Sequence, residues 1–133
     1  MEKSKEEKRC GLKNFTDKPH ILIVEDNKIV QANIKNMVLS FGCEVSVADT
    51  GHEAIEMYQK NHDLIFLDIY LPDMTGFGVY MAIRSQESIR HIPIIAITAD
   101  ENKKDECLAI GFDEFIVKPL SKQKCQEILI RWL

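Results

Sequence analysis

Short apolar runs and stretches with helical apolar spacing alternate along most of the chain. The runs cover residues 21–24, 63–68, 94–97 and 112–117. Runs of three or four apolar residues between polar ones are typical of strands covered on both faces, as in a parallel sheet. Alternation around Val45 and Val47 predicts one further strand over 44–48.

Between the runs, apolar residues recur at spacings of three and four, which predicts amphipathic helices. Asn27, Thr50 and Ser121 are suitable N-cap residues for three of them. The five expected helices run from Asn27 to the Gly42 stop, from Thr50 to about Lys60, from Phe77 to about Gln86, from Lys103 to Ile110, and from Ser121 to the end. Five strands alternating with five helices predict an α/β fold with right-handed crossovers and a parallel sheet.

Polar side chains stand where the apolar runs end. They are Glu25, Asp26, Asp68, Thr98 and Lys118. Because parallel strands end at one edge of the sheet, we expect these side chains to converge there. Taken singly, each suits an ordinary role as a helix-start carboxylate, a strand terminator or a surface lysine.

The converging side chains also suggest a chemistry. Three carboxylates raise one another's pKa unless a cation lies among them, and hard oxygen ligands suit Mg²⁺. A lysine and a hydroxyl beside them can bind phosphoryl oxygens. The set predicts a site that places phosphate on or beside an aspartate.

Composition narrows the alternatives. The 133 residues suit one domain, 45% are hydrophobic, and the formal net charge of −4 disfavours nucleic-acid binding. No apolar run is long enough to cross a membrane, and the start lacks a secretory signal, so a cytoplasmic domain without membrane contact is expected. Residues 1–18 are expected to be a flexible charged tail or linker, and 19–133 the folded domain. The four cysteines, at 10, 43, 107 and 125, lack zinc-site spacing, which favours reduced thiols.

Four segments at the strand ends carry a family resemblance. They are Val24-Glu25-Asp26-Asn27, Leu67-Asp68-Ile69-Tyr70-Leu71-Pro72, Ile97-Thr98-Ala99 and Val117-Lys118-Pro119-Leu120. In order and spacing they resemble the signature segments of the response-regulator (CheY-like) receiver domain. The resemblance implies a flavodoxin-like (βα)5 sandwich with parallel strand order 2-1-3-4-5, and a cis bond before Pro119.

The resemblance also implies a role for each site residue. Asp68 is expected to take a phosphoryl group from phosphohistidine. Mg²⁺, with Mn²⁺ as a substitute, is expected on Asp26 and Asp68, on Glu25 mostly through water, and on the carbonyl of Tyr70. The phosphoryl group is expected on Lys118, the Thr98 hydroxyl and the backbone N–H of Ala99. The expected switch pair is Thr98 and Phe115.

Some positions depart from the commoner family pattern. Thr75 stands where an acidic residue is frequent, and Phe115 lacks the hydroxyl of the commoner tyrosine. Tyr70 and Asp100 lie two residues beyond Asp68 and Thr98, at positions that affect the lifetime of the phosphoryl group in the family. We expect the Tyr70 ring to restrict water and lengthen that lifetime.

The Glu-Asp-Asn opening, the run from Ile94 to Ala99 and the end at Trp132 resemble receivers at the C-terminus of hybrid histidine kinases. The expected partners are then the kinase's phosphohistidine module and a histidine-phosphotransfer protein, docking near Ile29, Val30 and Pro119. A freestanding response regulator is the alternative, since the sequence starts with Met1 and shows no other domain. The family also allows a weak homodimer through the fourth helix, fifth strand and fifth helix.

Two other classes of protein are compatible with parts of this pattern. Phosphatases of the haloacid-dehalogenase type also use an aspartyl phosphate, but their nucleophile begins an Asp-x-Asp motif, whereas Tyr70 follows Asp68 at that spacing. Interaction modules that do not depend on phosphorylation usually lack a site residue, and none is missing here. Whether the domain counts as an enzyme depends on its belonging to a kinase, since by itself it would catalyse only its own phosphorylation and dephosphorylation.

Overall fold

A computed structural model describes residues 18–58, 61–86 and 91–133. In these residues five parallel strands form one sheet in the order β2-β1-β3-β4-β5. The strands are β1 (His20–Val24), β2 (Glu44–Ala48), β3 (Leu64–Asp68), β4 (Ile94–Thr98) and β5 (Glu114–Val117). The predicted strand order and parallel sheet are confirmed. The predicted tail lies outside the described residues except for Lys18.

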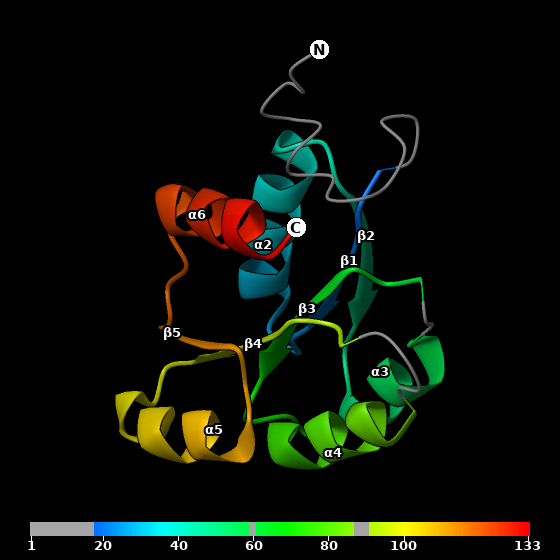
Figure 1. The fold of residues 1–133 in the computed structure, drawn as a ribbon, viewed down its shortest axis with the longest axis vertical. Coiled ribbons are helices and arrows are strands. Elements are labelled where there is room, and N and C mark those ends of the chain that lie inside the picture. The colour runs from blue at the N-terminus through cyan, green and yellow to red at the C-terminus, as the bar shows by residue number, and fades with distance from the viewer. Residues whose placement is uncertain (1–17, 59–60, 87–90) are drawn as a thin grey trace.

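Helices cover both faces of the sheet (Figure 1). They are α2 (Lys28–Ser40), α3 (Gly51–Met57), α4 (Gly76–Gln86), α5 (Lys104–Ile110) and α6 (Lys122–Trp132). On one face α2 and α6 pack over β1 side chains such as Ile21 and Ile23. On the other face α3, α4 and α5 pack over Leu22 and Val24. Alternate residues of each strand therefore enter two separate hydrophobic clusters, which explains why the strands are apolar throughout.

The predicted helix caps are confirmed. Asn27 Oδ1 accepts from the N–H groups of Ile29 and Val30, and Thr50 Oγ1 accepts from Glu53 N. The Ser121 hydroxyl accepts from Lys124 N at 3.0 Å. Each cap satisfies N–H groups that the first turn of a helix leaves without a partner.

Several element boundaries differ from the predictions. The fourth helix was expected from Lys103, but a 3-10 turn (Glu101–Lys103) precedes α5, because Asp100 accepts from Asn102 N and caps that tighter turn. The second helix ends at Met57, and the predicted end near Lys60 lies outside the described residues. Strand β5 starts two residues later than Phe112, whose ring instead stacks on Tyr80 at 4.5 Å.

Two buried or partly buried carboxylates at the amino end of the sheet, Asp113 and Asp63, have fixed partners. Asp113 Oδ2 accepts from Ile94 N at 2.8 Å and from Arg84 Nη2 at 3.1 Å, and Asp113 Oδ1 lies 3.1 Å from His91 Nε2. Asp63 accepts from the backbone N–H of His20 at 2.8 Å. These carboxylates fasten loops to the starts of β1 and β4.

The end of α6 is fastened to β5 by polar contacts. The indole N–H of Trp132 donates to Glu114 Oε1 at 2.7 Å, and Arg131 pairs with the same oxygen. Trp132 also packs against the hydrophobic cluster under α2 and α6. No helix among the described residues is long and apolar enough to cross a membrane.

Candidate functional site

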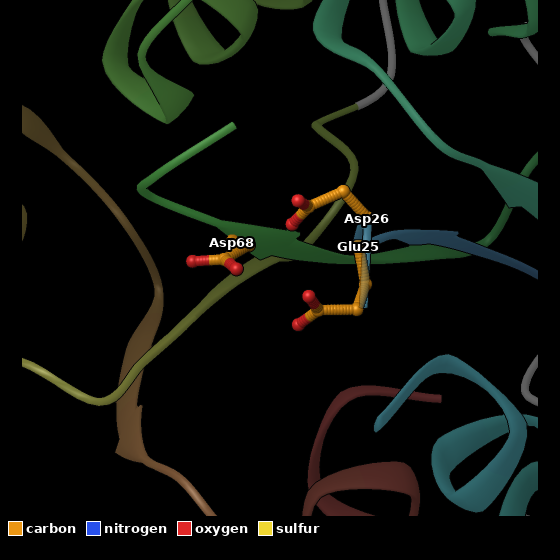
Figure 2. Close-up of side chains that lie close together, drawn as sticks. All are labelled: Glu25, Asp26 and Asp68. Carbon is orange, nitrogen blue, oxygen red and sulfur yellow. The ribbon is translucent and has the colours of Figure 1, made fainter. Parts of the chain in front are cut away.

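Three carboxylates meet at the carboxyl end of the sheet (Figure 2). Glu25 and Asp26 follow β1, Asp68 ends β3, and one oxygen of each lies within 4.8 Å of the others. Glu25 and Asp68 are only 2% and 4% exposed, whereas Asp26 is exposed to solvent. The predicted convergence of these three residues is therefore seen in the structure.

Lys118 joins two of these carboxylates. Its Nζ lies 2.6 Å from Glu25 Oε1 and 2.8 Å from Asp68 Oδ2. Burial opposes the charge of the lysine, but its hydrogen bonds with Asp68 and Glu25 outweigh burial and raise its pKa. Burial also raises the pKa of the Glu25 carboxyl, against the opposing effect of Lys118. The contact between Lys118 and Glu25 was not anticipated from the sequence.

The turn after β1 is held by residues that the sequence analysis missed. The side-chain amide of Gln31 donates to the Glu25 carbonyl and to Asp49 Oδ1, both at 2.7 Å. The backbone N–H of Asn27 donates to Glu25 Oε2 at 3.0 Å. These bonds fix the backbone that carries Glu25 and Asp26. A glutamine in the first turns of a helix carries no periodic signal that would have identified it.

A cavity of about 320 Å³ opens beside Asp68. Its lining residues are Asp68, Tyr70, Thr98, Ala99, Asp100 and Lys118. The backbone N–H of Tyr70 donates to Asp68 Oδ1 at 3.1 Å, which orients the carboxylate. Thr98 is fully buried, and its hydroxyl oxygen accepts from Asp100 N at 3.3 Å. The cavity thus brings together the residues predicted to bind phosphate.

A hydrogen bond crosses the rim of this cavity. The Tyr70 hydroxyl donates to Asp100 Oδ2 at 2.8 Å, joining the loops that follow β3 and β4. This bond lowers the pKa of Asp100 and raises that of Tyr70. The two residues were singled out separately from the sequence, but their contact was not predicted.

The remaining predicted residues line neither the acidic site nor the cavity. Phe115 is half-buried and packs against the hydrophobic cluster under α3, α4 and α5. Ile29 on α2 is 74% exposed, whereas Val30 is half-buried. Pro119 is exposed and follows the predicted cis peptide bond. Thr75 Oγ1 accepts from Gly78 N at 3.3 Å, at the start of α4.

The donor atoms suit a divalent cation. When ionised, the three carboxylates bear three negative charges and Lys118 one positive charge, so two negative charges remain in excess. Carboxylate oxygens, one of them exposed, fit Mg²⁺, which keeps several waters and takes few protein ligands. The residues present therefore fit a bound magnesium ion.

Two related proteins match most of the chain. Hybrid signal transduction histidine kinase L of Dictyostelium discoideum is 36% identical over 121 residues, which are 84% of this chain and 7% of the kinase. The polar-differentiation response regulator DivK of Brucella ovis is 34% identical over 116 residues, 85% of this chain and 94% of DivK. The chain thus spans a small fraction of the kinase but nearly all of DivK.

Solved structures share the fold. The receiver domain of sensor histidine kinase PA1611 from Pseudomonas aeruginosa, with a magnesium ion in its active-site cleft, has a TM-score of 0.78 and 35% identity, covering 87% of this chain and 98% of that one. The receiver domain of Saccharomyces cerevisiae Ssk1, in complex with the phosphotransfer protein Ypd1, has a TM-score of 0.77 and 26% identity, covering 86% and 88%.

A family model links these matches to the site. Receiver domains of two-component signalling bind Mg²⁺ in their acidic site and interact with histidine kinases or phosphotransfer proteins. The model of the response regulator receiver domain matches residues 21–130, a range that includes every residue of the acidic site and cavity. The chain belongs to the response regulator receiver domain family.

Proposed function

We propose that Asp68 accepts a phosphoryl group from a phosphohistidine of a partner protein. The supporting observation is that Asp68 is buried at a strand end, opens into a cavity, and has Lys118 Nζ at 2.8 Å. An Asp68 oxygen forms a bond to phosphorus while the P–N bond to the donor imidazole breaks, and the electron pair of that bond stays on the imidazole nitrogen. Positioning and charge neutralisation provide most of the catalysis that this reaction needs.

Glu25, Asp26, Asp68 and the Tyr70 carbonyl are the proposed magnesium ligands, with Mn²⁺ as a substitute. Bound there, the ion would neutralise charge on the phosphoryl oxygens during transfer. Asp26 supplies an exposed carboxylate, and Glu25 is oriented by Asn27 N and the ammonium of Lys118.

Lys118 and the end of β4 bind the transferred group in this proposal. Lys118 neutralises Asp68 before transfer and then donates to a phosphoryl oxygen, while the Ala99 N–H and the Thr98 hydroxyl donate to others. Thr98 is buried and lines the cavity, and its hydroxyl turns toward the transferred group in this step. Its movement vacates space toward which the half-buried ring of Phe115 turns, which is the proposed switch.

Tyr70 and Asp100 set the lifetime of the phosphoryl group in this proposal. Their hydrogen bond crosses the cavity rim and limits the approach of an attacking water. Tyr70→Ala should speed autodephosphorylation severalfold, and Tyr70→Phe should have part of that effect because it removes only the hydroxyl. Phosphate release from the phosphorylated protein measures this rate. An unchanged rate in Tyr70→Ala would refute the proposed role.

The central test is phosphorylation by a small donor. Incubation with acetyl phosphate and Mg²⁺ should add one phosphoryl group, detected by mass, and Asp68→Asn should abolish the gain. The matched control is Asp105→Asn, an exposed residue on α5 that removes the same charge. Continuous turnover of a small phosphate ester would instead favour the haloacid-dehalogenase type of phosphatase.

We propose further that the domain is the C-terminal receiver of a hybrid histidine kinase. The similarity to kinase L supports this, whereas the near-complete coverage of DivK supports a freestanding regulator. Rapid transfer of phosphate from Asp68 back to a phosphotransfer protein would favour the relay, and no transfer would count against it. Ile29→Asp should slow that transfer, since Ile29, with Val30 and Pro119, is the proposed docking surface and is 74% exposed.

A weak homodimer is also proposed, through the face made by α5, β5 and α6. Exposed apolar side chains on it, such as Ile110 and Val117, support the proposal. Sedimentation equilibrium with and without beryllofluoride tests it, and a monomer under both conditions at millimolar concentration would refute it.

A further inference from the structure

The loop between β3 and α4 is a narrow, closed turn. Gly76 N donates to the Ile69 carbonyl at 2.7 Å, and Tyr70 and Thr75 form an antiparallel bridge. Asp73 lies in the middle of the segment that this bridge closes. Any contact that fixes Asp73 therefore restrains the whole loop, including the peptide group of Tyr70.

Asp73 is bonded to the start of helix α3. Its Oδ1 accepts from Gly51 N at 2.8 Å, its Oδ2 accepts from His52 N at 2.9 Å, and the His52 ring pairs with the same Oδ2. Thr50 takes the next N–H group, that of Glu53. The first N–H groups of α3 are thus satisfied by a carboxylate from another part of the chain.

Two further features accompany this contact. The bond from the His52 N–H holds the pKa of Asp73 far below its ordinary value. Beside it, Met74 packs so closely on Gly51 that a Cβ there would lie 2.4 Å from Met74 Cγ. The loop and the helix therefore share a polar and an apolar contact.

We propose that Asp73 is a positioning residue for the bound cation. By fastening the loop to α3, it holds the Tyr70 N–H on Asp68 Oδ1 and fixes the position of the Tyr70 carbonyl, the proposed magnesium ligand. Asp73 does not touch the ion in this view. The inference rests on the proposed function, because the Tyr70 carbonyl serves as a ligand only if Mg²⁺ binds at Asp68.

The test measures magnesium affinity rather than phosphorylation. Asp73→Asn keeps one acceptor oxygen and puts an NH₂ donor in place of the other, so the N–H groups of Gly51 and His52 no longer have an oxygen each. Asp105→Asn is the control with the same change of net charge. We expect Asp73→Asn to weaken Mg²⁺ binding about tenfold, as is typical of changes behind metal ligands, and Asp105→Asn to change it less than about twofold. Amide chemical shifts in a Mg²⁺ titration report the affinity, and hydrogen exchange at Gly51 and His52 reports the loss of the Asp73 contact.

Ionic strength separates positioning from the charge of Asp73. At about 1 M salt the screening length is only about 3 Å, so a through-space effect would vanish whereas a positioning effect would persist. An affinity ratio between wild type and Asp73→Asn that collapses to one in high salt would overturn the proposal. So would equal affinities when the amides of Gly51 and His52 have lost protection.

A replacement variant and the wild-type affinity make each outcome decisive. If Asp73→Asn does not fold, Asp73→Ser replaces it, because serine caps helices well but offers one oxygen on a shorter side chain in place of the two carboxylate oxygens. If wild type itself fails to bind Mg²⁺, the proposed metal site is wrong. If wild type binds and the variant matches it, only the positioning role of Asp73 is wrong.

Discussion

The two ends of the sheet both contain buried or partly buried charge, but they differ in how that charge is matched. At the amino end, Asp113 has a backbone donor, an arginine and a histidine, and Asp63 has a backbone donor. At the carboxyl end, three carboxylates lie together, and Lys118 pairs with two of them, Glu25 and Asp68. Matched charge holds loops together, whereas unmatched charge leaves room for an added cation and a phosphoryl group.

Asp113→Ala should give the largest loss of stability. It removes the acceptor for Ile94 N and the carboxylate beside Arg84, whose side chain is only 14% exposed. Removing one partner of a buried pair costs about 3–5 kcal/mol. Urea unfolding measures the loss. Saturating Mg²⁺ should not restore it, because the cluster of carboxylates that could hold a metal among the described residues lies at the other end of the sheet. Restoration by Mg²⁺ would show that the two ends are not independent.

Lys118→Met should lower the stability by less than Asp113→Ala, and Mg²⁺ should restore much of the lost stability. The substitution leaves Glu25 and Asp68 without their shared ammonium, a loss of about 2 kcal/mol for hydrogen bonds to charged groups. A divalent ion that binds the folded state can replace that charge. Unfolding with EDTA and with excess Mg²⁺ tests this, and a loss that is equal in both would contradict an excess of negative charge.

In the absence of metal, Asp26→Asn should raise the stability of the protein, whereas the two substitutions above lower it. Asp26→Asn removes one of three neighbouring like charges from an exposed position, so the metal-free protein should gain up to about 1 kcal/mol. The variant should also lose most of its stabilisation by Mg²⁺. Thermal unfolding with and without Mg²⁺ tests both, with Asp105→Asn as the control. A destabilised metal-free variant would mean that Asp26 is matched by partners.

Asp73→Asn should have the smallest effect on stability. It tests whether a carboxylate behaves according to the end of the sheet where it lies or according to whether its charge is matched by partners. Asp73 lies at the carboxyl end yet is matched by backbone groups, and the bond from His52 N lowers its pKa. A lowered pKa gives stability that is present above the unfolded value, near 3.9, and is lost as the pH falls toward the folded value. Wild type should thus exceed Asp73→Asn in stability near neutral pH, and the difference should close in acid. A difference that does not depend on pH would contradict this.

Much of the fold followed from local patterns in the sequence. Apolar runs located the strands, and the cap residues Asn27, Thr50 and Ser121 located three helix starts. The 3-10 turn before α5 was missed because the Asp100 cap competes with the helical spacing that begins at Lys103. A local pattern cannot show whether the 3-10 turn or the α-helical turn forms where the two overlap.

The site was predictable in its residues and less so in its contacts. Convergence of Glu25, Asp26 and Asp68 followed from strand direction alone. The bonds made by Gln31, Asp73 and Asp113 join residues about 20 positions apart or connect separate loops. Single polar residues in loops have no periodicity, so their partners depend on packing that only the structure provides.

The position of the single tryptophan decides what a simple fluorescence experiment can report. Trp132 lies in the last turn of α6, with its indole bound to Glu114 of β5. Its emission should therefore respond to rearrangement of β5 against α6. Titration with Mg²⁺ alone should leave the spectrum nearly unchanged, whereas beryllofluoride should shift it if the signal travels from the aspartate through β5. The chain thus carries its own optical probe of output, separate from metal binding.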